Sequence, residues 1–168
     1  MKRWTLIVTG TLLALIVGTF IAGSFLPRDH VATGTVEVAA LPERVWAVIS
    51  NFEATPIWRD DVTAIRIDPP GEDGKVRFTE TSSNGEIPFE VIRQDPPHRQ
   101  VVRVIDDDLP FGGIWTWDLE PAGAGTRVTI TEAGFIKNPA IRVMGALFFS
   151  PADTINGYLA ALATHMNH

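Results

Sequence analysis

Apolar residues form one long uninterrupted run at the start of the chain and short alternating runs after it. The segment Trp4 to Leu26 has no charged residue and exceeds the roughly 20 residues that an α-helix needs to cross a bilayer. Lys2 and Arg3 precede this segment, which favours an N-terminus in the cytoplasm and a body outside it. The pattern predicts a single-pass transmembrane anchor over residues 1–28.

A cleaved signal peptide is the alternative interpretation of the same segment. Ala22-Gly23-Ser24 supplies small residues of the kind that a cleavage site needs. The apolar run is longer than the ~7–15 residues typical of such a peptide, so the anchor is the favoured interpretation. Either interpretation places the body outside the cytoplasm, in one case membrane-bound and in the other secreted.

After the anchor, residues 29–34 are interpreted as a short polar linker and residues 35–168 as one folded domain. Residues 35–38 alternate like a strand. Residues 42–52 carry apolar side chains at helical spacing, with a proline in the first turn. Pro56 prevents continuation of this helix, and a second short helical turn is expected to begin at Ile57.

Six further strand-like runs follow, separated by turns rich in proline, glycine, asparagine and aspartate. The runs are residues 62–67, 75–81, 86–93, 100–105, 114–119 and 126–131. Short turns between successive strands predict an antiparallel meander. From Asn138 to Met166 the apolar spacing becomes helical, and Pro151 must kink that helix or restart it with Ser150 as N-cap. A sheet with one apolar face needs a cover, which this C-terminal helix would provide, so the sequence predicts an α+β fold.

Composition and charge exclude several classes of function. The chain has no cysteine, which excludes disulfides, thiolate metal sites and a cysteine nucleophile. Its formal net charge is −6, so the basic surface of a nucleic-acid-binding protein is missing. The four histidines are scattered, and Asp106-Asp107-Asp108 lacks the spacing of a calcium loop. We therefore expect no metal, no cofactor and no nucleic-acid partner.

Strand alternation assigns side chains to the two faces of the predicted sheet. The residues expected to face the C-terminal helix are Val76, Phe78, Glu80, Ile87, Phe89, Val91, Trp115, Trp117, Leu119, Val128, Ile130 and Glu132. The strand at 100–105 is ambiguous, because Val102 and Val104 form one face while Arg103 lies on the other with apolar neighbours. If Arg103 faces inward, it is a candidate for binding an anionic head group.

Glu80 and Glu132 are the inward carboxylates. A carboxylate in an apolar pocket has a raised pKa or needs a partner, so each is a weak candidate for a polar anchor or a general acid/base. The alternative, which we favour, is that both reach water at strand ends or pair with an arginine such as Arg77 or Arg103.

Two stretches of the sequence carry a family resemblance. LPERVWAVISNFEATPIW (residues 41–58) and DLPFGGIWTWDLEPAGAGTRVTITEAGFIKNP (residues 108–139), followed by the C-terminal helix, resemble the START-like (SRPBCC) superfamily over about residues 32–166. The branch that they resemble is the bacterial polyketide cyclase/dehydrase-like one. The resemblance implies a helix-grip (START/Bet v 1-like) fold, a curved antiparallel sheet of about seven strands around a long C-terminal helix. It also implies an apolar cavity between the two, and Pro151 departs from the unbroken helix expected there.

The resemblance implies binding of a hydrophobic small molecule or lipid more firmly than catalysis, since members of the superfamily share no catalytic constellation. The expected cavity lining is Trp58, Phe78, Phe89, Val91, Arg103, Trp115, Trp117, Ile130, Met144, Phe148 and Tyr158. A membrane-anchored binding or carrier domain is therefore the favoured function. The alternatives are a cyclase- or dehydratase-like enzyme using Glu80 or Glu132, and a domain presented at the membrane for a protein partner.

Overall fold

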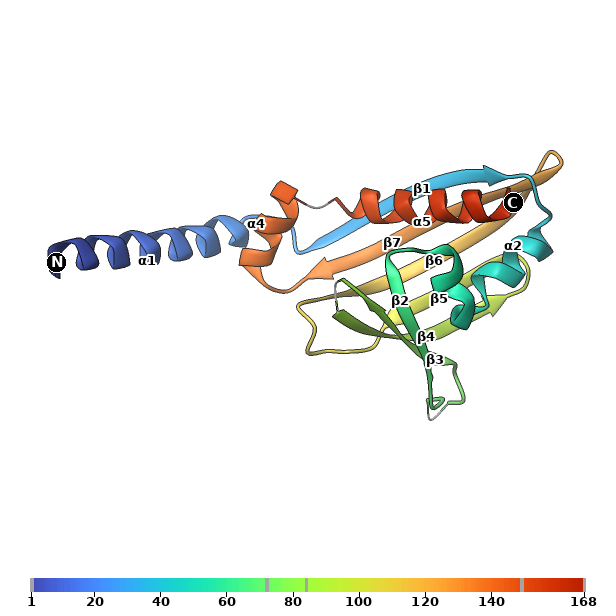
Figure 1. Ribbon diagram of the computed structural model, residues 1–168, viewed down its shortest axis with the longest axis horizontal. Helices are drawn as coiled ribbons and strands as arrows, with labels where there is room; N and C mark the ends of the chain where they lie inside the picture. Colours follow the sequence, from blue (N-terminus) through green and yellow to red (C-terminus); the bar gives the residue numbers. More distant parts are fainter. Residues whose placement is uncertain (1, 72, 84, 149, 168) are drawn as a thin grey trace.

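One curved antiparallel sheet of seven strands, in the order β1-β7-β6-β5-β4-β3-β2, forms the body of the protein (Figure 1). The computed structural model describes residues 2–71, 73–83, 85–148 and 150–167. The strands are β1 (Asp29–Val38), β2 (Val62–Asp68), β3 (Arg77–Ser82), β4 (Gly85–Asp95), β5 (Arg99–Val104), β6 (Phe111–Ala122) and β7 (Gly125–Ile136). This order confirms the predicted meander, with β1 returning to pair with the last strand, β7.

Residues 29–34 are not a linker, contrary to the prediction. They form the first part of β1, which pairs with β7 from Asp29↔Phe135 to Val38↔Thr126. Along β1 every second side chain is exposed, so only a small apolar surface faces the core and the sequence pattern there is weak. One of the inward positions is Gly34, where a methyl group would collide with Ile155 and Leu159, so the glycine lets a helix approach the strand closely.

Two short helices follow β1 as predicted, but the first ends at Ile49 instead of residue 52 and the second begins at Thr55 instead of Ile57. Helix α2 (Pro42–Ile49) has its proline in the first turn and buries Val45 and Ile49 against the sheet. A 3-10 turn, η1 (Phe52–Ala54), and the single-turn helix α3 (Thr55–Trp58) come next. The ring of Phe52 stacks on Phe78 of β3, with the ring centroids 4.1 Å apart, so this segment closes one side of the core.

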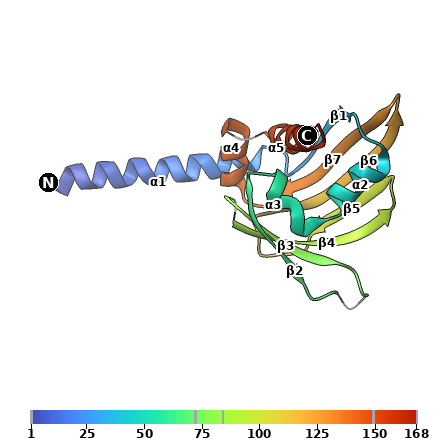
Figure 2. The same cartoon turned by 45° about the vertical axis from the view of Figure 1, so that its right-hand side comes forward.

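The C-terminal helical region is two helices, α4 (Pro139–Phe148) and α5 (Pro151–Met166). Ser150 lies in the N-cap position with an extended backbone, and its side chain makes no capping hydrogen bond. Pro151 therefore restarts the helix instead of kinking it. Helix α5 lies across the inner, concave side of the sheet, which curves around it (Figure 2). Four of its residues, Ile155, Tyr158, Leu159 and Leu162, are buried there.

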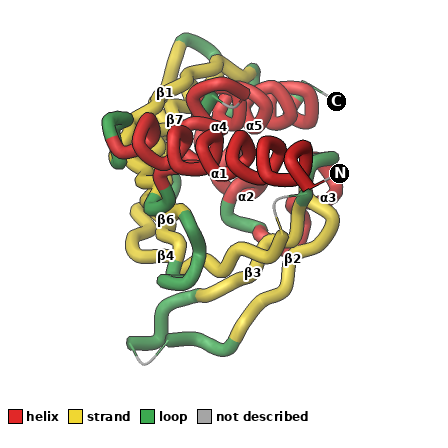
Figure 3. The backbone as a smooth tube through the Cα atoms, turned by 90° about the vertical axis from the view of Figure 1, so that its left-hand side faces the viewer, coloured by secondary structure: helices red, strands yellow, loops and turns green. Residues whose placement is uncertain are grey.

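Helix α1 (Lys2–Ser24) extends away from the body and ends beside α4 (Figures 1 and 3). By length and composition its segment Ile7–Ser24 is able to cross a membrane, and the body buries only 6% of it. The hydroxyl groups of Thr11, Thr19 and Ser24 donate to backbone carbonyls four residues earlier. The helix thus satisfies these polar groups internally, as an apolar environment requires.

Candidate functional site

The two faces of the sheet differ sharply in chemistry. Residues paired across neighbouring strands point to the same face, and Trp117 pairs with Ile130 on one side and Gln100 on the other. These residues are buried and belong to the concave face beneath α5. Phe78, Phe89 and Val91 lie on this face as predicted, and so do Leu119 and Val128. Val76 precedes β3 and is exposed, so its predicted inward position is wrong.

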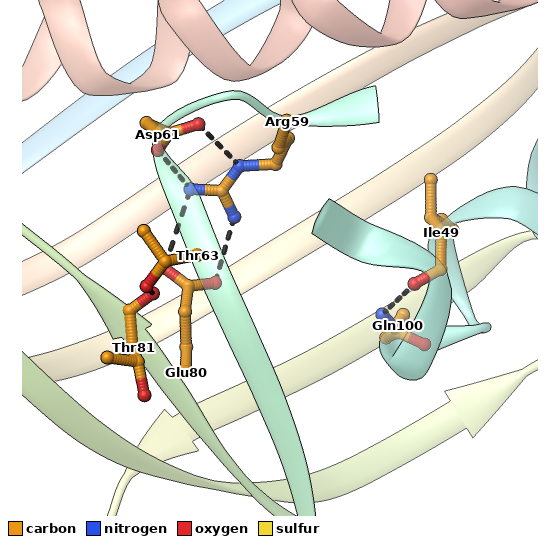
Figure 4. Close-up of polar contacts among 7 residues, drawn as sticks. All are labelled: Ile49, Arg59, Asp61, Thr63, Glu80, Thr81 and Gln100. Carbon is orange, nitrogen blue, oxygen red and sulfur yellow. Dashed lines mark hydrogen bonds and ion pairs between the residues drawn. The ribbon is translucent and has the colours of Figure 1, made fainter. Parts of the chain in front are cut away.

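A group of charged side chains lies on the concave side at its border with α3. We call Arg59, Asp61 and Glu80 the concave cluster. Arg59 Nη1 donates to Glu80 Oε2 at 2.9 Å, and Arg59 Nη2 donates to Asp61 Oδ2 at 2.6 Å (Figure 4). Burial raises the pKa of Glu80 above its usual range, although the neighbouring Arg59 opposes the shift. One guanidinium is shared by two carboxylates, so the concave cluster is net negative when all three groups are ionised.

Tyr158 of α5 joins the concave cluster to the tryptophans of the core. The guanidinium of Arg59 lies 5.1 Å from the centre of the Tyr158 ring. The same ring meets Trp58 edge-on at a centroid distance of 5.1 Å and Trp117 at 5.8 Å. Burial raises the pKa of the Tyr158 hydroxyl far above its usual value, so it remains protonated at neutral pH. Tyr158 therefore presents a neutral hydroxyl inside an aromatic environment.

Two buried indole N–H groups accompany this tyrosine. The Nε1 atoms of Trp58 and Trp117 have no hydrogen-bond acceptor with good geometry among the described residues. Trp117 lies close enough to the Tyr158 hydroxyl to lower its pKa without forming a full hydrogen bond. A buried N–H without an acceptor costs roughly 1–3 kcal/mol. The indole N–H groups of Trp58 and Trp117 are thus available to donate hydrogen bonds to a ligand.

A hollow of about 180 Å³ adjoins Trp58. It lies between α2, α3 and the end of α5, and its lining is Ala47, Val48, Asn51, Ala54, Ile57, Trp58 and His165. Trp58 belongs to the core and also borders this hollow. Beneath α5, by contrast, Trp117, Ile130 and Tyr158 pack against one another as core residues.

Glu132 and His30 form a second polar pair on the concave side, in the C-terminal half of β7. The distance from His30 Nε2 to Glu132 Oε1 is 3.4 Å. Glu132 pairs across the strands with Trp115, which confirms that its side chain points inward. Burial raises the pKa of the Glu132 carboxyl, and His30 opposes the shift. Trp115 is half-buried and packs on the edge of the core.

Arg103 does not face the interior, so its prediction as a binder of an anionic head group there is wrong. It lies on the outer, convex face, because Val102, its neighbour in β5, takes the buried concave position. Arg103 Nη2 donates to Glu90 Oε1 at 2.7 Å, and Arg77 Nη2 donates to Glu90 Oε2 at 2.7 Å. We call these three residues the convex cluster. Arg77, followed by Arg103, holds the pKa of Glu90 below its usual range.

The two remaining predicted lining residues lie on α4. Met144 is exposed on a helix that contacts α1 and β7, so it does not line the space beneath α5. The break before Pro151 moves α4 away from the concave face, which is why the continuous helical stripe misled the prediction. The side chain of Phe148 lies outside the described part of the chain.

Sequence reasoning missed several residues of this site. Glu80 was expected to reach water or to pair with an arginine such as Arg77 or Arg103. It does pair with an arginine, but the partner is Arg59, which follows α3 and belongs to no periodic pattern. Gln100 was missed as well. It is fully buried on the concave face, where Nε2 donates to the Ile49 carbonyl at 3.4 Å (Figure 4). The signal that finds it is its place in phase with Val102. Among the described residues, no group of three or more His, Asp or Glu side chains is arranged to hold a metal ion.

A curved antiparallel sheet around a helix, with an aromatic concave face, defines the helix-grip class. The family model described as polyketide cyclase / dehydrase and lipid transport matches residues 29–166. The chain therefore belongs to this family, as its sequence motifs suggested. The match begins with the first residue of β1, in agreement with the strand assignment and three residues before the expected start.

Solved structures share the fold at low sequence identity. A START superfamily protein from Mycobacterium smegmatis has a TM-score of 0.63 at 19% identity, over 82% of this chain and 97% of that one. Norcoclaurine synthase from Thalictrum flavum has a TM-score of 0.64 at 17% identity, over 84% and 97%. The di-domain aromatase/cyclase StfQ of the steffimycin pathway has a TM-score of 0.65 at 13% identity, over 83% of this chain and 52% of StfQ. No curated protein matches the chain in sequence.

Proposed function

We propose that the protein is a membrane-anchored binding domain for a hydrophobic small molecule or lipid with a neutral polar end. The observation that carries the proposal is the buried N–H group of Trp58, which has no hydrogen-bond acceptor among the described residues. The ring of Trp58 contacts the ring of Tyr158. A ligand carbonyl or hydroxyl supplies the acceptor, and the aromatic residues of the concave face receive its apolar part. Because the residues beneath α5 are packed as core, binding requires Trp58 to move, and the hollow that it borders is the proposed point of entry.

The concave cluster argues for a neutral ligand over an anionic one. The Nε, Nη1 and Nη2 groups of Arg59 already donate to Asp61 and Glu80. A ligand carboxylate would have to displace one of these acceptors and would meet a net negative group. An alcohol or ketone meets no such repulsion, and its oxygen can accept a hydrogen bond from the indole N–H of Trp58.

Ligand competition tests this proposal. The full-length protein in detergent micelles is offered a long-chain alcohol and the fatty acid of the same chain length, and complexes are counted by native mass spectrometry. The alcohol should bind more tightly. Trp58→Phe keeps an aromatic side chain, although a smaller one, and removes the donor, so it should weaken alcohol binding roughly 5–10-fold, the equivalent of one neutral hydrogen bond. Trp46→Phe, which alters an indole on α2, is the matched control. Stronger binding of the acid, or equal binding by Trp58→Phe, rejects the proposal.

Anchoring is the second part of the proposal, with α1 spanning the membrane and the body outside the cytoplasm. Its support is the apolar length of α1, its exposure and its internally bonded hydroxyls. The chain has no native cysteine, so a single cysteine reports its own location. Thr35→Cys should react with an impermeant maleimide added to intact spheroplasts. Protection of that cysteine until the cells are lysed would reverse the orientation, and release of the protein from washed membranes would indicate cleavage.

A single observation supports an enzyme as the second candidate function. The half-buried Glu132 has a raised pKa and an imidazole within 3.4 Å, as a general acid/base requires. Glu80 is the poorer candidate because both of its oxygens accept hydrogen bonds from Arg59. Cyclisation or dehydration of a poly-β-ketone substrate that survives in Glu80→Gln but is lost in Glu132→Gln would favour the enzyme. Absence of turnover by the wild-type protein would reject the enzyme hypothesis.

A further inference from the structure

The end of the body that adjoins α1 exposes a band of large apolar side chains. The residues are Phe25 after α1 and Ile141, Met144 and Leu147 on α4, with exposed fractions of 85%, 37%, 49% and 67%. The three α4 residues recur every third position, so they lie along one side of that helix. We call these four residues the α4 face.

Helix α4 is fixed to the end of α1 by close packing. Gly23 is buried against the Pro139 backbone, and a methyl group on Gly23 would overlap the Pro139 carbonyl. The Arg142 guanidinium donates to the carbonyls of Gly23 and Leu26 at 3.3 Å each, and to the carbonyl of Ile136 at 2.9 Å. A cation beside the carboxyl end of a helix also interacts favourably with the helix dipole. The position of α1 therefore determines the position of α4.

This packing sets the depth of α4 relative to a membrane. The apolar segment Ile7–Ser24 has 18 residues and a helical length of about 27 Å, close to the ~30 Å of a bilayer hydrocarbon core. Gly23 is next to last in that segment. When the segment occupies the hydrocarbon core, Pro139, which touches Gly23, must lie at its boundary.

We propose that the α4 face inserts into the interfacial layer of the membrane that α1 crosses. The proposal rests on the proposed anchoring by α1. The body is then seated on the lipid by two contacts, a spanning helix and an interfacial one, with the hollow beside Trp58 kept at the other side of the body. All four residues of the α4 face are uncharged, so the proposed contact is apolar.

Site-directed spin labelling measures this insertion directly. Single cysteines replace Leu147 on the α4 face, Leu13 in α1 and, as the control, Ile57, which is apolar and 77% exposed beside the hollow. The labelled full-length chain is placed in zwitterionic phosphatidylcholine nanodiscs. Labels at Leu13→Cys and Leu147→Cys should be accessible to oxygen and protected from a water-soluble nickel chelate. The label at Ile57→Cys should show the reverse.

The three labels distinguish the possible failures. A nickel-accessible label at Leu147→Cys, together with a protected one at Leu13→Cys, overturns the inference and leaves the anchoring intact. Nickel access at both positions overturns both. Spin–spin broadening at Leu147→Cys that disappears at one chain per disc assigns the face to a second copy and also overturns the inference.

A charge substitution provides an independent test on the same protein. Leu147→Glu should make the label at Met144→Cys accessible to nickel, because a carboxylate is strongly disfavoured below the headgroups. Ile57→Glu is the matched control and should leave that label protected. Both substituted side chains are exposed, so circular dichroism should report an unchanged fold. An unchanged label at Met144→Cys in Leu147→Glu contradicts the inference.

Discussion

The convex and concave clusters use the same residue types with opposite balance. On the convex face, Arg77 and Arg103 each donate to a different oxygen of Glu90. On the concave side, Arg59 alone is shared by Asp61 and Glu80. The pKa of Glu90 is lowered mainly by its hydrogen bond with Arg77, while burial raises the pKa of Glu80.

This difference separates a structural lock from a candidate binding group. Each oxygen of Glu90 accepts from its own arginine, so removal of Glu90 takes away the carboxylate that both arginines contact. The attraction of Arg59 does not fully offset the cost of burying the Glu80 carboxylate, so the pKa of Glu80 is raised. The indole N–H groups of Trp58 and Trp117, next to Tyr158, lack hydrogen-bond acceptors among the described residues. The polar groups that lack full compensation therefore lie on the concave side of the sheet. Perturbed groups of this kind tend to cluster at functional sites.

The largest expected effect comes from neighbouring residues of β6 that face opposite sides. Trp117→Ala removes a buried indole from the concave core and should lower the free energy of unfolding by ~3–5 kcal/mol. Thr116→Ala, which alters the convex face, should change it by about 1 kcal/mol or less. Urea titrations of both full-length variants in detergent, followed by circular dichroism, measure the two values. Equal losses would show that the concave face is not the main core.

The faces of most strands were predictable because alternation with a period of two is unambiguous where only one face is apolar. Trp115, Trp117 and Glu132 were placed correctly on that ground. Arg103 was not resolved because β5 carries buried valines on both faces, Val101 and Val102. The partners of the inward carboxylates, Arg59 and His30, were out of reach. Each partner comes from a segment distant in sequence from its carboxylate, and no local sequence pattern predicts a contact of that kind.

The second prediction compares the two carboxylates by neutral substitution. Glu90→Gln should clearly destabilise the protein at pH 7, because an amide offers one acceptor and turns its own donors toward the second arginine. Glu80→Gln should cost less than Glu90→Gln, because Arg59 keeps Asp61 as its charged partner and burial already disfavours the charged form of Glu80. Thermal unfolding measures both, with the exposed Glu120→Gln as the control for a lost charge. A greater loss for Glu80→Gln would invert the comparison.

The third prediction concerns pH. The folded-state pKa of Glu90 lies below its ordinary value of 4.5, so its contribution is fully present above that value and is lost as the pH falls through the folded pKa. The folded pKa of Glu80 lies above 4.5, so its contribution declines as the pH rises through the interval between the two values. Denaturant titrations across pH 3 to 8 should therefore show a smaller acid loss in Glu90→Gln. The difference between the wild type and Glu80→Gln should shift in favour of the variant as the pH rises. Parallel curves for all three proteins would contradict both pKa directions.

The smallest expected effect tests whether enclosure, and not the ion pair itself, gives the convex cluster its strength. Arg127 of β7 donates through Nη2 to Oε1 of Glu37 on the edge strand β1 at 2.8 Å, a bond nearly as short as those to Glu90. Both partners are about half exposed, so water and salt screen them. A double-mutant cycle with Arg127→Met and Glu37→Gln should give a coupling of about 0.2–1 kcal/mol, decreasing with added salt. A coupling as large as that between Arg77 and Glu90 would mean that contact geometry alone determines the strength. The distinction between the two faces would then lie in packing and not in charge.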